Sequence, residues 1–372
     1  MFPLQKRHRI TISNLSMIHR RLTAVRTAMT ELRLQALLVT EMAHVRYLTG
    51  FSGSSGLCVI TPEKQFFITD RRYKSQAPQE VDGFTIIIAK QRLFPLITEK
   101  SLIPKEVRIG FESEYVSVAD MKSLKKLLPG RHFTPATRIL ETVTAVKDDG
   151  EIALIRYAAQ ITDKVFKKIL ALIRPGIREC DIAAEISYWH RKYGAECDAF
   201  DPIVASGERG ALPHARASDK IIRRGEMVVL DFGCRYCGYH SDLTRTIAVG
   251  KPSVEMKKIY KIVFEAQKKA IDTVHNGVAA RSVDAVARKY IRQAGYGRYF
   301  IHSLGHGLGI QVHEPMRLSA LSTAILQTGN VVTIEPGIYI PGGGGVRIED
   351  DIVVRENGCD VLTTSSKELI IV

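Results

Sequence analysis

Hydrophobic and polar positions divide the first part of the chain into alternating helical and strand-like segments. Helical spacing of apolar residues predicts helices over Met17–Leu34 and Val118–Leu128, the second ended by Pro129-Gly130. Short apolar runs between turn residues predict strands over Ala36–Thr40, Gly56–Thr61, Gln65–Asp70, Phe84–Ala89 and Val107–Glu112. This alternation indicates a small α/β domain over residues 17–145, preceded by a loose basic extension at residues 1–16.

A polar stretch, Val146–Gly150, predicts a hinge before a second domain at residues 149–372. A long amphipathic helix follows it and stops at Pro175-Gly176, with Thr162 as the one polar residue on its apolar face. The apolar positions that recur at helical spacing are Ile152, Ile155, Ala159, Phe166, Ile169 and Ile173.

The second domain contains an internal duplication that is visible in its helices. Counted from Gly176, apolar or aromatic residues lie at offsets 6, 10 and 13 and a glycine lies at offset 18, and the same offsets recur from Gly277. The matched residues are Ile182, Ile186, Trp189 and Gly194 in the first copy, and Val283, Ala287, Tyr290 and Gly295 in the second. Two equivalent helices that end at equivalent glycines are therefore expected.

The strands after these helices repeat in the same way and carry acidic residues. Asp231 lies at offset 6 from Gly225, and Glu335 lies at offset 6 from Gly329. Each half then turns through a predicted hairpin, Cys234–Gly238 or Pro341–Gly345, and presents a further acid on the returning strand, Asp242 or Glu349. If the halves pack around a pseudo-twofold axis, the four carboxylates converge on that axis.

Length and composition exclude several other classes of protein. The chain has 372 residues, enough for two or three domains, and its 45% hydrophobic and 25% charged residues are typical of a globular protein. No apolar run approaches the ~18–20 residues that cross a bilayer, and the charged N-terminal segment does not resemble a signal peptide. Six scattered cysteines do not form a secreted disulfide framework, so we expect a cytoplasmic protein.

The balance of charged residues does not alter the expectation of a globular cytoplasmic protein. Lys and Arg number 53 against 39 Asp and Glu, a formal net charge of +14, but the excess is dispersed over helix faces. We therefore expect no specific nucleic-acid partner and no membrane partner.

Four carboxylates in a protein interior repel one another, so a cationic group must hold them together. Two divalent ions balance four negative charges, and water between two metals about 3.5–4 Å apart can be deprotonated near neutral pH. The best candidate for a remaining imidazole ligand is His306, in the glycine-rich stretch Ser303–Gly309. Oxygen-rich ligation with one nitrogen favours Mn²⁺, with Co²⁺, Fe²⁺ or Zn²⁺ as alternatives.

Several motifs in this domain resemble the pita-bread metallopeptidases, specifically the Xaa-Pro aminopeptidases and prolidases. They are Asp231-Phe232-Gly233, Ser241–Thr246, His302–Gly309, Glu335–Tyr339 and Gly345–Asp350. The resemblance implies an α+β fold, in which a duplicated helix-helix-strand-hairpin catalytic domain follows a smaller creatinase-type α/β domain. It also implies a homodimer and peptide substrates with proline at the second position.

The resemblance further implies roles for individual residues. Five residues would be the ligands of two metal ions, with Asp242 and Glu349 bridging them: Asp231, Asp242, His306, Glu335 and Glu349. Glu335 would also be the general acid and base for a bridging hydroxide that attacks the carbonyl before proline.

Further residues would act on the substrate or support the ligands. His302 and His313 would bind the substrate and stabilise the tetrahedral intermediate, as would the outlying His214. Arg347 shares a strand face with Glu349 and would hold the substrate or order the carboxylates, with Thr244 and Tyr339 as supporting partners.

The leading functional hypothesis is a metal-dependent aminopeptidase that removes the residue before proline. A prolidase restricted to Xaa-Pro dipeptides is the main alternative. A non-catalytic binding protein with the same fold is the third, and the complete ligand set argues against it.

Overall fold

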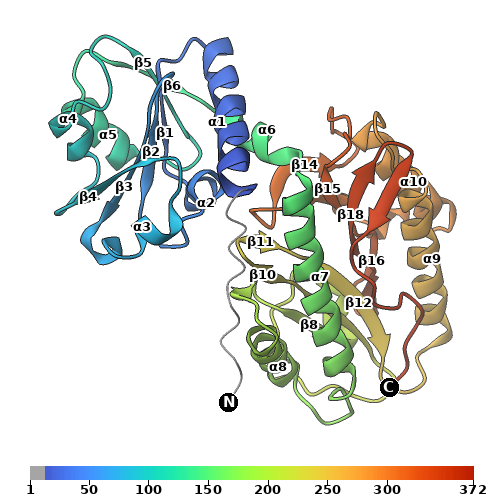
Figure 1. The fold of residues 1–372 in the computed structure, drawn as a ribbon. Helices are drawn as coiled ribbons and strands as arrows, with labels where there is room; N and C mark the ends of the chain where they lie inside the picture. The colour runs from blue at the N-terminus through green and yellow to red at the C-terminus, as the bar shows by residue number, and fades with distance from the viewer. Residues whose placement is uncertain (1–12) are drawn as a thin grey trace. The chain divides into compact units, whose positions relative to one another are not determined.

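The computed structural model describes residues 13–372, and the chain divides between Val143 and Thr144 into two compact units (Figure 1). Most of the predicted basic extension, residues 1–12, lies outside the described residues, whereas residues 13–16 belong to the first helix. No helix of the described residues is long and apolar enough to span a membrane.

The first unit is built on one mixed sheet with the strand order β4-β3-β2-β1-β5-β6. Its strands are β1 (Ala36–Val39), β2 (Leu57–Ile60), β3 (Gln65–Asp70), β4 (Thr85–Ala89), β5 (Arg108–Phe111) and β6 (His132–Pro135). Its α-helices are α1 (Ser13–Glu31), α2 (Met42–Thr49), α3 (Ala77–Glu80), α4 (Pro95–Glu99), α5 (Val118–Leu127) and α6 (Ile139–Ala145), with a 3₁₀ turn at Arg71–Tyr73. All five predicted strands are confirmed, whereas β6 was not predicted.

Burial explains why these segments form the sheet and its cover. Strand β1 pairs antiparallel with β2 and parallel with β5, and all of its residues are buried. Helix α1 buries apolar residues at helical spacing, namely Ile18, Leu22, Val25 and Met29. The helix begins before the predicted Met17 and ends at Glu31, short of the predicted Leu34.

A buried polar pair connects α2 to the end of β5. His44 Nδ1 lies 2.5 Å from Glu112 Oε1, and both side chains are almost fully buried. The other Glu112 oxygen accepts the backbone N–H groups of Thr40 at 2.6 Å and Glu41 at 2.9 Å. Glu112 thereby holds the chain as it leaves β1 and enters α2.

The second unit consists of two similar halves, each with two long helices followed by strands. The first half contains α7 (Asp149–Leu170), α8 (Glu179–Lys192), β7 (Cys197–Asp198), β8 (Ile203–Ser206), β9 (Met227–Phe232), β10 (Cys234–Tyr236), β11 (Tyr239–His240) and β12 (Leu243–Ala248). The second half contains α9 (Val254–Ile271), α10 (Ala280–Gln293), β13 (Gly305–Gly307), β14 (Glu314–Leu318), β15 (Val331–Ile334), β16 (Gly337–Ile340), β17 (Gly344–Arg347), β18 (Asp350–Arg355) and β19 (Gly358–Val361). Two 3₁₀ turns, Gly207–Ala211 and Gly297–Tyr299, complete this unit.

Each helix pair covers the strands of its own half. One apolar core joins α7 and α8 to the sheet β12-β9-β8, and another joins α9 and α10 to the sheet β14-β13-β15-β18-β19. The strands therefore lie between the two helix pairs (Figure 1). The apolar residues predicted on this helix face are buried, and Thr162 among them bonds to Ser241 Oγ at 2.7 Å. Helix α7 ends at Leu170, before Ile173 and the predicted stop at Pro175.

The turns confirm the duplication with one correction in each half. Gly194 and Gly295 follow equivalent helices with φ values of 98° and 91°, which is the left-handed backbone that favours glycine after a helix. Cys234 belongs to strand β10, not to the hairpin turn as predicted, and the turn is Cys237-Gly238. In the second half, Gly344-Gly345 belongs to strand β17 and not to the predicted turn. All six cysteines are free thiols.

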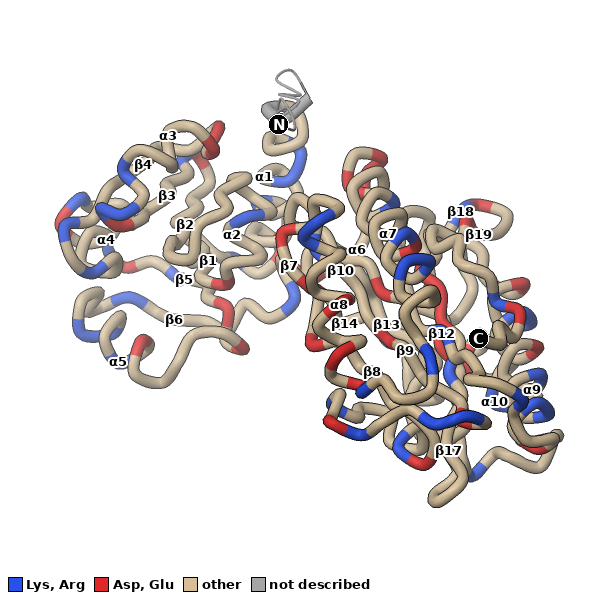
Figure 2. The backbone as a smooth tube through the Cα atoms, turned by 90° about the horizontal axis from the view of Figure 1, so that it is seen from below, with Lys and Arg blue, Asp and Glu red and all other residues tan. Residues whose placement is uncertain are grey.

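The excess of basic residues is dispersed. Lys and Arg occur on helices and loops of both units and alternate with Asp and Glu (Figure 2). The view shows no single long basic tract that would account for the net charge of +14.

We predict that the N-terminal unit loses stability as pH rises through the titration of His44. Burial lowers the pKa of His44, but the Glu112 carboxylate outweighs this effect and raises the pKa above its ordinary value of 6.5. The contribution to stability is therefore complete below about pH 6.5 and is lost as pH rises through the folded-state pKa. This loss of stability can be measured by hydrogen–deuterium exchange of the backbone amides of β1 and β5, after correction for the intrinsic pH dependence of the exchange rate.

A His44→Gln variant tests the cause. It should remove the pH dependence and lower the free energy of unfolding by about 1–3 kcal/mol at acidic pH, because a buried carboxylate loses its partner. His132→Gln, an exposed substitution in the same sheet, is the matched control. A pH profile that His44→Gln leaves unchanged would contradict the assignment.

Candidate metal centre

The duplication places four acidic side chains at equivalent points of the two halves. Asp231 lies near the end of β9 and Glu335 directly follows β15, while Asp242 and Glu349 directly precede β12 and β18. Strands β9 and β12 pair antiparallel, as do β15 and β18, so each half brings its two acids to one end of a strand pair. The local fold therefore directs the four acids toward one region.

The predicted imidazole lies among these acids. His306 Nε2 is 3.5 Å from Glu335 Oε1 and 3.8 Å from Asp242 Oδ2. Potential ligand atoms of Asp242, His306 and Glu349 all lie within 4.8 Å of one another, and the three residues are buried. Asp231 is connected to the same cluster through Arg347 and through its charge on the other acids. Asp242, His306, Glu335 and Glu349 thus lie together, and Arg347 links Asp231 to this part of the site.

His306 is neutral and has the tautomer that suits metal binding. Its Nδ1 bonds to the carbonyl oxygen of Gly307 at 3.0 Å, which requires the proton on Nδ1 and leaves the Nε2 lone pair free. Burial, with a smaller contribution from His313, lowers the pKa of His306 to about 3. At neutral pH this ring is therefore uncharged and can offer the Nε2 lone pair to a metal ion.

In the part of the chain that the structure describes, the four carboxyl groups have one Lys or Arg partner, Arg347. Burial, with repulsion from neighbouring acids, raises the pKa values of Asp242 and Glu349 well above their ordinary range. Burial also raises the pKa of Glu335 to about 8. Among the described residues, one oxygen of Asp231 and one of Asp242 are buried without a hydrogen-bond partner. Orphaned carboxylate oxygens beside a free imidazole nitrogen fit divalent cations.

One guanidinium is buried at the centre and orders part of the site. Arg347 donates to Asp231 Oδ2, to Tyr339 Oη at 2.6 Å and to Thr244 Oγ1 at 3.2 Å. Tyr339 in turn lies 2.9 Å from His302 Nε2, and His302 Nδ1 bonds to the carbonyl of Ser303. The phenol therefore donates to the imidazole. These contacts are those of a residue that orders carboxylates, while a contact of Arg347 with substrate stays a prediction.

The other predicted substrate residues differ in exposure. His302 is half-buried and engaged at both ring nitrogens, whereas His313 and His214 are exposed. The rings of His313 and His306 meet edge to face, with centroids 4.4 Å apart. Burial lowers the pKa values of His302 and His313, and the charge of His214 contributes to both shifts. The structure thus places His313 against His306 and connects His302 to the cluster through Tyr339.

Arg317 was missed by the sequence analysis. It lies on β14 directly opposite His306 on β13, and its side chain is exposed. Its charge acts on His306, His313 and Glu335, lowering the pKa of each in part. Alternation along a strand could have been a signal, because Arg317 follows His313 by four residues and would share its face.

A buried ion pair supports the loop before β14 and was also missed. Lys147 Nζ contacts Glu314 Oε2, and both side chains are nearly inaccessible. Glu314 directly follows His313, and its other oxygen accepts the backbone N–H of Ile310 at 3.1 Å. Lys147 was interpreted as part of a polar hinge, and hydropathy offers no sign of its burial.

Both units are similar to known protein families. Residues 153–356 match the family model described as metallopeptidase family M24, and residues 21–146 match the creatinase/prolidase N-terminal domain. An Xaa-Pro dipeptidase from Pyrococcus horikoshii is 40% identical over 91% of this chain and 95% of its own length.

Solved structures match over almost the whole chain. An Xaa-Pro dipeptidase from Bacillus anthracis is 42% identical with a TM-score of 0.92, and the match covers 95% of this chain and 100% of that one. An X-Pro aminopeptidase from Thermotoga maritima is 39% identical with a TM-score of 0.86, covering 91% and 98%. Both substrate classes thus occur among similar structures.

We predict that metal-free protein binds Mn²⁺ with release of protons and gains stability. Burial and neighbouring acids raise the pKa values of Asp242 and Glu349 well above their ordinary range, and both groups bind a cation only as carboxylates, so binding should displace protons. Binding should therefore strengthen as pH rises, and a hundredfold excess over Kd should stabilise the fold by about 2.7 kcal/mol. Calorimetric titrations in buffers of different ionisation enthalpy measure the protons released.

Two variants make this test specific. Asp242→Asn should weaken Mn²⁺ binding, whereas Asp181→Asn, which alters an exposed ion pair of α8, should leave it unchanged. Equal binding by wild type and Asp242→Asn, or no thermal shift with Mn²⁺, would exclude a metal centre here.

Proposed function

Because this chain belongs to metallopeptidase family M24 and carries a creatinase/prolidase N-terminal domain, we propose that it hydrolyses the peptide bond that precedes proline. The observation that supports this most is a cluster of acids, three of them buried and Glu335 partly buried, around a neutral imidazole. The names of similar proteins, Xaa-Pro dipeptidase and X-Pro aminopeptidase, agree with the proposal. The complete set of acids argues against a non-catalytic binding protein.

Five residues would hold two divalent ions, with Mn²⁺ as the first candidate: Asp231, Asp242, His306, Glu335 and Glu349. When bound, such ions would polarise the scissile carbonyl and lower the pKa of a water molecule. Carboxylate oxygens dominate the donor set, which is the preference of Mn²⁺, while the single imidazole also suits Co²⁺, Fe²⁺ or Zn²⁺.

Glu335 would move the proton during hydrolysis. The nitrogen of an Xaa-Pro bond carries no hydrogen, so the departing proline must receive a proton to leave as a secondary amine. Glu335 would take a proton from the attacking water and deliver it to this nitrogen as the C–N bond breaks. Its carboxylate is held by the hydroxyl of Thr333, which donates to Oε1 at 3.2 Å.

The three imidazoles would bind substrate beside the acids. His313 and His214 are exposed, so their rings would be accessible to a peptide carbonyl or carboxylate that accepts a hydrogen bond. His302 is held by Tyr339, which Arg347 orders in turn. Its fixed orientation would position the substrate while the acids carry out the chemistry.

The position of Arg317 supports Xaa-Pro dipeptides as one candidate class of substrate. It is an exposed cation whose charge reaches His306, His313 and Glu335. A proline carboxylate is present next to the scissile bond only in an Xaa-Pro dipeptide, and a guanidinium binds carboxylates in a forked geometry. Longer peptides with proline at the second position are the other candidate class, consistent with the Thermotoga maritima neighbour.

Two further features are proposed with this activity. The free cysteines support a reducing, cytoplasmic location. The family resemblance supports a homodimer, which light scattering of the purified chain would test.

We predict that Glu335→Ala reduces turnover of an Xaa-Pro peptide by about 10²–10⁴-fold at saturating Mn²⁺ because proton transfer is lost. Metal content measured in parallel separates this effect from loss of a ligand. Glu226→Gln, a half-buried carboxylate in an ion pair with Lys220, is the control and should retain turnover. A turnover number of Glu335→Ala equal to that of the wild type would refute the role of Glu335.

Substrate length gives a second prediction. Arg317→Gln should raise KM for an Xaa-Pro dipeptide by about tenfold, since a charged hydrogen bond is worth about 1.5–3 kcal/mol, and should spare an Xaa-Pro pentapeptide. His214→Ala should instead slow both substrates alike. If Arg317→Gln affects the two lengths equally, Arg317 does not read the proline carboxylate.

A further inference from the structure

The two halves of the second unit meet at the main chain of Glu349. Its backbone N–H donates to the carbonyl of Thr244 at 3.1 Å, and its side-chain Oε2 accepts the Thr244 hydroxyl at 2.7 Å. Thr244 lies on β12 of the first half, and Glu349 precedes β18 of the second. The position of this acid therefore depends on contacts between the halves.

Arg245, which follows Thr244 on β12, forms further hydrogen bonds at this junction between the halves. Its guanidinium donates to the carbonyl oxygen of Glu349 and to that of Thr244, the latter at 2.9 Å. A further nitrogen donates to Asp350 Oδ1 at 2.7 Å. The side chain is almost fully buried, so none of these bonds is shared with bulk solvent. Arg245 thus bonds the carbonyl of Glu349 while its charge is balanced by the next residue.

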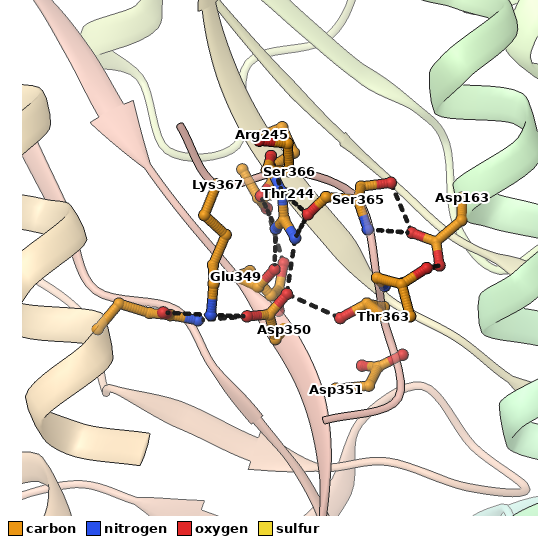
Figure 3. A network of polar contacts seen from close by, with 12 residues as sticks. Asp163, Thr244, Arg245, Glu349, Asp350, Asp351, Thr363, Ser365, Ser366 and Lys367 are labelled. Carbon is orange, nitrogen blue, oxygen red and sulfur yellow. Dashed lines mark hydrogen bonds and ion pairs between the residues drawn. The ribbon is translucent and has the colours of Figure 1, made fainter. Parts of the chain in front are cut away.

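The C-terminal segment Thr363–Lys367 supplies the remaining partners of this network (Figure 3). Arg245 donates to the carbonyls of Ser365 at 2.7 Å and Ser366 at 3.0 Å. The Lys367 ammonium bonds to Asp350 Oδ2 at 2.8 Å, and the Thr363 hydroxyl bonds to Oδ1 at 2.8 Å. The segment therefore contacts both members of the Arg245–Asp350 pair.

The segment is itself anchored to the helical layer. Asp163 on α7 accepts the backbone N–H groups of Thr364 at 2.8 Å and Ser365 at 2.9 Å (Figure 3). Gln267 on α9 donates to Asp350 Oδ2 at 2.8 Å. Helices of both halves thus hold the network in place.

A parallel contact holds the acid of the other half. Asp351 Oδ2 accepts the backbone N–H of Asp242 at 2.9 Å, and Asp351 is completely buried. Asp350 and Asp351 are consecutive residues of β18. Asp350 is linked to the main chain of Glu349 through Arg245, and Asp351 bonds directly to the main chain of Asp242.

We propose that Arg245 is a positioning residue for the metal centre, and that the C-terminal segment Thr363–Lys367 sets its orientation. The inference rests on the proposed role of Glu349 as a ligand. Glu349 lies beside other acids that repel it, so its position depends on the bonds that hold it. Thr244 bonds its side chain and its N–H, and the guanidinium of Arg245 bonds its carbonyl oxygen at the junction of the halves. Groups that orient metal ligands in this way typically change metal affinity by about 10–100-fold when removed.

The test measures Mn²⁺ binding to the metal-stripped full chain by calorimetry, together with the melting temperature of the metal-free protein. Arg245→Lys keeps the charge but loses the fork and should weaken Mn²⁺ binding by about tenfold. Lys367→Met acts at a partly exposed position and should weaken binding in the same direction even if Arg245→Lys fails to fold. Lys367→Arg should recover most of the affinity.

Lys220→Met is the matched control, because Lys220 forms an ion pair of similar exposure with Glu226 in the same unit. It should leave the Mn²⁺ dissociation constant unchanged. A lower melting temperature with unchanged Mn²⁺ affinity in Lys367→Met would overturn the proposal, as would an equal loss of affinity in Lys220→Met. Failure of the wild type to bind Mn²⁺ would instead refute the proposed metal centre.

Discussion

Electrostatic repulsion among buried acids is the constraint on which the second unit depends. Four carboxylates meet where water is largely excluded, and Arg347 is the one guanidinium that contacts any of them among the described residues. Burial of so many like charges is unfavourable unless cations or protons compensate. The two apolar cores that flank the strands supply the packing that keeps the acids together. A site held under such strain favours divalent cations over neutral ligands.

Three buried cations of the chain each organise a different part of this site. Arg347 orders Asp231 and, through Tyr339, an imidazole. Arg245 bonds the main chain of Glu349, and Lys147 pairs with Glu314 at the end of the loop that carries His313. Each of the three forms an ion pair with an acidic residue of the same unit. The net basic charge of the protein therefore says little about its function, whereas the location of these few cations says much.

The long helices, five strands of the first unit and the equivalence of the halves could be predicted because they depend on local periodicity, whereas β6 and the short helices of the first unit were not predicted. Strand Gln65–Asp70 has the predicted bounds, and the buried face of α7 is the predicted one. Element ends are less predictable: α1 begins earlier than predicted, and Cys234 joins a strand because β10 pairs with β7. Such ends are decided by neighbours that are distant in sequence, and a local pattern does not contain them.

The sequence alone determined which acids are equivalent, since a duplicated gene segment repeats its spacing whether or not the chain is folded. It also determined the family, through motifs that need no coordinates. Only the tertiary structure decided which nitrogen of His306 is free, that Arg317 lies opposite His306, and which basic residues are buried. These features arise from contacts between residues far apart in sequence, such as Arg347 with Asp231 at a separation of 116 positions, and a one-dimensional pattern carries no such distances.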